Sequence, residues 1–70
     1  MDPNTLLTRR KLAEALTAAG YPIAAGTLSN LARVNNGPPY KIFGRSALYR
    51  WGTSLQWAEA RTVERNVAAE

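Results

Sequence analysis

The sequence predicts a small, mainly α-helical domain with one β-hairpin. Three observations support this prediction. Two stretches near the N-terminus carry apolar side chains at helical spacing, a Gly-Pro-Pro segment interrupts the helical pattern, and two short aromatic-rich runs flank Gly44-Arg45. The 70 residues are enough for one domain, which we expect to span 1–70 with an ordered core of about 6–65.

The first helix is expected over residues 9–19. Thr8 precedes it and can accept a hydrogen bond from an amide of the first turn. Gly20 suits the position after the last turn, and Pro22 follows closely. The apolar stripe that predicts the helix consists of Leu12, Ala13, Leu16 and Ala19.

A second helix is expected over residues 25–33, after a short connection. Leu28 and Leu31 give it an apolar side, but several of its residues are poor helix formers, so packing must stabilise it. Its outward face carries small polar residues and one cation: Gly26, Thr27, Ser29, Asn30 and Arg33. This face is either a plain solvated surface or one that approaches another molecule closely.

The prolines at 38 and 39 are expected to stop the second helix, because proline lacks an amide donor and restricts the preceding residue. A hairpin follows, with Gly44 in the turn and Lys41 and Arg45 toward or at its tip. An isolated hairpin is marginal in water. We therefore expect its apolar side chains to dock on the helices: Tyr40, Ile42, Leu48 and Tyr49.

The last helix is expected from residue 51 onward, capped by Gly52 or Thr53 and fraying beyond about Arg65. Its two tryptophans, Trp51 and Trp57, are expected in the core. The order helix, short turn, helix, hairpin and helix is that of a small winged helix-turn-helix, in which the two-stranded hairpin is the wing.

Charge and composition narrow the function. The formal charge is +4, and residues 9–50 carry seven cations against one acid, a net +6. The isoelectric point of about 10.1 is typical of nucleic-acid partners, although a solvated cationic surface would give the same value. The chain has no Cys or His and no evident pair of acids or phosphate loop, so we expect neither an enzyme nor a metal site. Without a membrane-length apolar run or a signal pattern, we expect a cytoplasmic protein.

The sequence resembles the excisionase-like family, also called recombination directionality factors, whose MerR-like winged-helix domain occurs in phages and mobile elements. Four features carry the resemblance: LLTRRKLAEAL, TLSNLAR, GPPYKIFGRSALYR and Trp57, eight residues after Tyr49. It covers Leu6 to about Arg61 and extends to small prophage transcription regulators. The chain departs from the family pattern at 52–54, where a Ser-Asp-Leu-like helix start is common.

The resemblance implies a double-stranded DNA partner and no catalytic activity or cofactor. It assigns base edges or nearby phosphates to the outward face of the second helix, the wing contacts to Lys41 and Arg45, and phosphate contacts to Arg9 and Arg10. It further implies cooperative binding of several copies to neighbouring sites, DNA bending, and help to a tyrosine or serine integrase in excising the element. Two alternatives remain: a transcription regulator on the same scaffold, and a module whose basic face meets an acidic protein.

Overall fold

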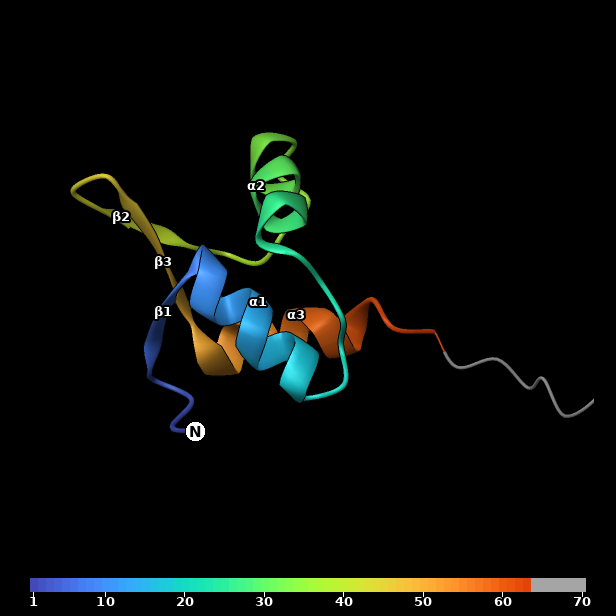
Figure 1. The fold of residues 1–70 in the computed structure, drawn as a ribbon. Helices are drawn as coiled ribbons and strands as arrows, with labels where there is room; N and C mark the ends of the chain where they lie inside the picture. Colours follow the sequence, from blue (N-terminus) through green and yellow to red (C-terminus); the bar gives the residue numbers. More distant parts are fainter. Residues whose placement is uncertain (64–70) are drawn as a thin grey trace, which may run out of the picture.

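The computed structural model describes residues 1–63, which form three helices and a three-stranded antiparallel sheet (Figure 1). The helices are α1 (Arg9–Ala18), α2 (Ala25–Arg33) and α3 (Trp51–Ala60). The bounds of α2 are those expected from the sequence, and α1 ends one residue earlier. The expected fraying beyond about Arg65 lies outside the described residues. None of the helices in residues 1–63 has the length and apolar character needed to cross a membrane.

The sheet has the order β1-β3-β2, with β1 at Leu6–Thr8, β2 at Lys41–Phe43 and β3 at Ser46–Arg50. The expected hairpin is present as β2 and β3. The prediction of a sheet with only these two strands was wrong, because β1 adds a third strand. Leu7 lies opposite Tyr49 in this pairing. A three-residue strand is too short to show a period, and its partner lies about forty residues away, so no local signal predicted it.

The core lies between α1, α3 and one face of the sheet. Leu12 and Leu16 from α1 are fully buried, as are Leu28 from α2 and Tyr49 from β3. Trp51 is buried as expected, whereas Trp57 is only partly buried against the core. The expectation that Ile42 docks the hairpin was wrong: it is exposed, because the hairpin extends beyond the helices. Tyr40 is 41% exposed, but its ring lies against Arg9 at the start of α1.

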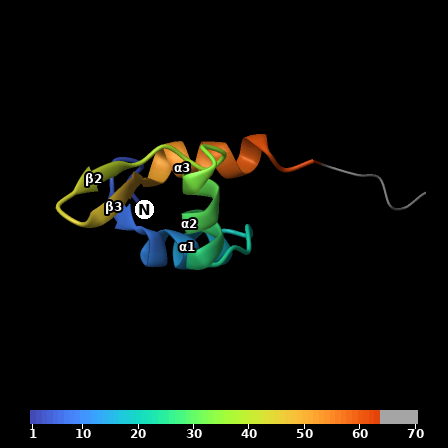
Figure 2. The ribbon, with the colours of Figure 1, turned by 90° about the horizontal axis from the view of Figure 1, so that it is seen from above.

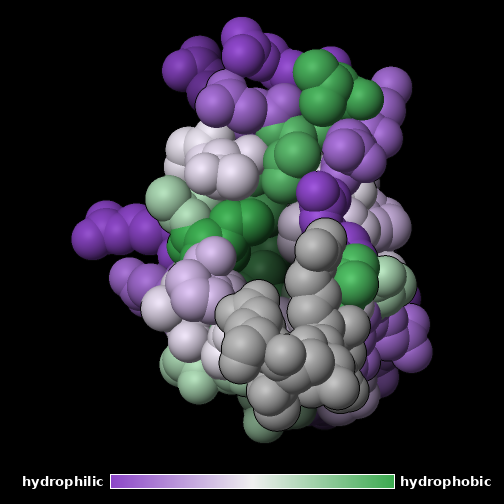
Figure 3. Space-filling model, turned by 90° about the vertical axis from the view of Figure 1, so that its right-hand side faces the viewer, coloured by the Kyte–Doolittle hydropathy of each residue, from purple (hydrophilic) through white to green (hydrophobic). Residues whose placement is uncertain are grey.

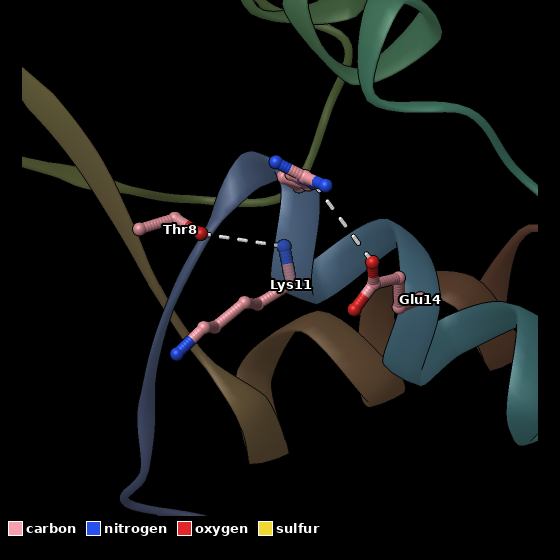
Figure 4. A network of polar contacts seen from close by, with 4 residues as sticks. Thr8, Lys11 and Glu14 are labelled. Atoms are coloured by element: carbon pink, nitrogen blue, oxygen red, sulfur yellow. Dashed lines mark hydrogen bonds and ion pairs between the residues drawn. The ribbon is translucent and has the colours of Figure 1, made fainter.

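Both ends of α1 have the expected caps. The hydroxyl oxygen of Thr8 accepts a hydrogen bond from the backbone N–H of Lys11 at 3.3 Å (Figure 4). At the other end Gly20 has a φ of 106°, and the N–H of Tyr21 donates to the carbonyl of Leu16 at 2.8 Å. This is a Schellman motif, in which glycine adopts the left-handed conformation without a side-chain clash.

The helix α2 ends for a different reason from the one expected, which was the pair of prolines. Asn35 adopts a positive φ of 55°, and the N–H of Asn36 donates to the carbonyl of Leu31 at 3.0 Å. A second Schellman motif therefore ends the helix, and its left-handed residue, Asn35, lies three residues before Pro38. Gly37 then passes close to α2, where a Cβ would lie 3.1 Å from that of Leu31.

The N-terminus of α3 is capped by backbone carbonyls. The N–H of Trp51 donates to the carbonyl of Thr5 at 2.9 Å, and that of Gly52 donates to Pro3 at 2.8 Å. The expected cap by Gly52 or Thr53 was therefore wrong: Arg50 holds the cap position and makes no side-chain cap. A Cβ on Gly52 would lie 2.7 Å from that of Pro3, so glycine permits this approach.

Candidate nucleic-acid interface

The outward face of α2 keeps most of the polar residues that the sequence placed there. Gly26, Thr27, Asn30 and Arg33 are exposed, whereas Ser29 is partly buried. The helix packs mainly on α1, and Leu28 is its one fully buried side chain among the described residues. A helix held along one side leaves its small residues open to a surface that approaches from the other.

Asn30 and Arg33 form one polar unit on this face. The Arg33 guanidinium donates from Nη2 to Oδ1 of Asn30 at 3.0 Å, one helical turn apart. The contact orients the guanidinium along the helix and occupies the amide oxygen, while the Nδ2 donors of Asn30 are not part of it. Such a pair can present donors from both residues to acceptors on a ligand.

The hairpin presents two of the predicted contacts: Arg45 in the turn, and Lys41 at the far end of β2, where it lies opposite Leu48. Lys41 and Arg45 are both exposed. Phe43 lies opposite Ser46, which leaves Gly44 and Arg45 as the two central turn residues. Gly44 has a φ of 63° and Arg45 is not among the residues with positive φ, the pattern of a type II′ turn. This turn continues the twist of both strands and fixes the backbone of Arg45 at the tip.

Arg9 is engaged within the fold, a role that sequence reasoning missed. Its Nε donates to the Tyr49 hydroxyl at 2.9 Å, and its guanidinium carbon lies 5.2 Å from the Tyr40 ring centroid. The two tyrosine rings are themselves 5.4 Å apart, in a tilted arrangement. Arg9 thus joins the start of α1 to the sheet. Because aromatic residues 31 and 40 positions away make the site, no local pattern could reveal it.

The other cations at the start of α1 are exposed. Arg10 Nε lies 4.0 Å from a carboxylate oxygen of Glu14, and both side chains are largely in water, so the pair contributes little to stability. Figure 4 shows the Lys11 side chain extending away from α2. Of these residues, Arg10 stays available to an anionic ligand, since a weak exposed ion pair is readily exchanged.

The helix α2 and the hairpin come from separate parts of the chain but project on the same side of the α1–α3 pair (Figure 1). Seen from above, the tip lies at one end of the molecule and α2 near the middle (Figure 2). Arg33, Lys41 and Arg45 are therefore carried on two projections that an extended anionic ligand can meet together.

Arg61 has a structural role that the sequence did not indicate. Its guanidinium carbon lies 4.8 Å from the Trp57 ring centroid, and Nη1 donates to the carbonyl of Asn36 at 3.0 Å. These contacts tie the segment after α2 to α3. Beside them lies a cavity of about 450 Å³ between the three helices. Figure 3 shows apolar side chains gathered around a hollow on this face.

Comparisons with protein-family models, with curated proteins and with solved structures gave no match to this chain. The candidate interface therefore rests on the geometry and charge of the chain itself.

Proposed function

We propose that the protein is an architectural DNA-binding factor of excisionase type, built as a winged helix-turn-helix. In this proposal α1 and α2 are the helix-turn-helix, and β2 with β3 is the wing. The main support for it is the common direction of two projections: α2, which carries exposed polar residues, and the hairpin, which carries exposed cations. The major groove accepts an α-helix, and its base edges offer the acceptors that Asn30 and Arg33 can bond.

The charge distribution favours DNA over an acidic protein partner. Arg33 on α2 and both Lys41 and Arg45 on the hairpin are exposed cations on well-separated elements. Regularly spaced phosphates along a duplex can meet cations on both elements at once. An acidic protein would have to place its carboxylates at the same spacing to do so.

The small size of the module favours assembly on DNA. One domain of this size covers little surface on a duplex and binds weakly alone. We therefore propose that two or more copies bind neighbouring sites cooperatively, bend the DNA, and assist a tyrosine or serine integrase. The protein would act at the nucleoid in the cytoplasm and would have no catalytic activity of its own.

A binding-site selection followed by a gel-shift series tests this function. Selection from random duplexes should enrich a site, and DNA carrying two adjacent copies of it should pass directly to the doubly bound complex. A duplex with the second copy scrambled is the control and should bind more weakly. If single copies bind independently and do not bend the DNA, the excisionase hypothesis is contradicted and a simple transcription regulator is favoured. Failure to enrich any duplex would contradict DNA binding altogether.

A further inference from the structure

The strand β2 exposes its two apolar side chains, Ile42 and Phe43. Phe43 is 77% exposed, the highest value among the large hydrophobic side chains of residues 1–63, and Ile42 is 63% exposed. A single exposed apolar residue is ordinary on a protein surface and indicates no function alone. The position of Phe43 relative to its charged neighbours is what distinguishes it.

Strand pairing places Phe43 on the outer face of the sheet. Ile42 lies opposite the buried Ala47, so its side of the hairpin continues the face that packs on the helices. Phe43 and Lys41 alternate to the other face, and Arg45 follows Phe43 across the turn. Phe43 is therefore the last strand residue before the turn, and the exposed cations Lys41 and Arg45 stand two residues before and after it in the chain.

The hairpin backbone is constrained at this point. Phe43 is paired with Ser46 and is followed at once by Gly44, the positive-φ residue of the turn. Figure 2 shows the hairpin reaching out from the helices, so its tip meets no other element. A side chain on such a projection can enter a narrow space that the body of the domain cannot.

The charges around Phe43 indicate which surface receives it. A second copy of the chain offers the apolar cavity between its helices, lined in part by Leu31, Trp57 and Arg61. That lining holds a cation and no acidic side chain, so it opposes the entry of a tip bearing Lys41 and Arg45. A DNA minor groove is bordered by phosphates on both sides and accepts apolar wedges between base steps.

This inference rests on the proposed function and deepens it. We propose that Phe43 is an apolar wedge: it enters the minor groove, partly unstacks one base step and so bends the duplex. Lys41 and Arg45 hold the tip by contacts to the flanking phosphates. Affinity then comes mainly from the cations and from α2, whereas the bend comes from the ring.

The test uses a single-site duplex labelled for fluorescence energy transfer between its ends, with 2-aminopurine beside the step under the wing. Wild type should raise the 2-aminopurine fluorescence and shorten the end-to-end distance. Phe43→Ala should lose both signals while binding within about threefold of wild type, because the cations that contact phosphate remain. Phe43→Leu should restore part of the bend, since leucine also serves as a wedge. Ile42→Ala, the matched control on the other face, should behave as wild type.

Several results would overturn the wedge. If Phe43→Ala bends and unstacks the duplex as wild type does, or if wild type binds without bending, Phe43 is not a wedge although DNA binding stands. If Phe43→Ala changes only the cooperativity on a two-site duplex, the ring contacts a neighbouring copy. Absence of any wild-type binding would overturn the proposed function together with the wedge.

Discussion

The guanidinium of Arg9 donates to the hydroxyl of Tyr49, which is fully buried, at 2.9 Å. The contact joins the first residue of α1 to the middle of the sheet. A cation at a helix N-terminus is disfavoured by the helix dipole. Here the tyrosine hydroxyl and the adjacent rings offset that cost, so the residue does not need an anionic ligand to explain its position.

The Arg9–Tyr49 contact should therefore be measurable in stability. Tyr49→Phe and Arg9→Ala should each lower the free energy of unfolding, because a hydrogen bond to a charged donor in a partly buried site contributes about 1.5–3 kcal/mol. A double-mutant cycle monitored by urea unfolding should give a coupling energy of similar size, about 1.5–3 kcal/mol, between the two residues. Strictly additive single effects would mean that the contact is not formed in solution.

A pair of glycine substitutions tests the capping of α3. Gly52→Ala should lower the free energy of unfolding by about 1–3 kcal/mol, because the added Cβ overlaps Pro3. Gly26→Ala is the matched control: its Cβ would meet nothing within 4 Å, so better helix propensity should raise the stability by up to about 1 kcal/mol. Thermal melts of both variants beside wild type measure these changes in stability. A Gly52→Ala protein as stable as wild type would contradict the close approach of residues 1–5 to α3.

A substitution at Ser54 is expected to raise the free energy of unfolding. Its side chain is fully buried, and its Oγ has no hydrogen-bond partner among the described residues. Ser54→Ala removes an unpaired buried hydroxyl, so the free energy of unfolding should rise by about 1 kcal/mol. Chemical denaturation of this variant beside wild type is the measurement. A clear loss of stability would show that the hydroxyl has a partner.

The parts of the fold that sequence reasoning predicted are those with local signals. The apolar spacing of α1, Thr8 at its start and Gly20 after its end lie within a few residues of one another, and each has the expected role. The strand β1 was not predicted from the sequence, because its partner strand lies about forty residues away. The need for glycine at position 52 was not predicted for the same reason, because it depends on contact with the distant residue Pro3.

The residues of the candidate interface also fall into those with a local sequence signal and those without one. Exposed polar residues of α2 and the cations of the hairpin followed from periodicity and turn chemistry, because both are local. Arg9 did not, since its tyrosine partners come from the sheet. The exposure of Phe43 was also missed, because no sequence pattern shows how far a hairpin extends beyond the helices.

Asn30 tests base recognition by α2. Asn30→Ala removes the amide donors and releases Arg33 from its 3.0 Å contact. Binding to the selected site should weaken by about 1–3 kcal/mol, while binding to random duplex changes little. Gln56→Ala, an exposed amide on α3, is the control and should bind as wild type. Equal weakening on both duplexes would mean that Asn30 contacts phosphate and does not read bases.

A salt titration of affinity measures how many phosphates the α2 face and the hairpin contact when they bind duplex DNA together. With about five phosphate contacts, the log–log slope of wild type should be roughly −4 to −5. Arg45→Ala should keep its melting temperature, weaken all duplexes and reduce the slope by about one. Lys11→Ala removes the same charge from a side chain that points away from α2, and should leave the slope unchanged. Equal slopes for wild type and Arg45→Ala, with equal affinities, would mean that the hairpin tip does not contact DNA.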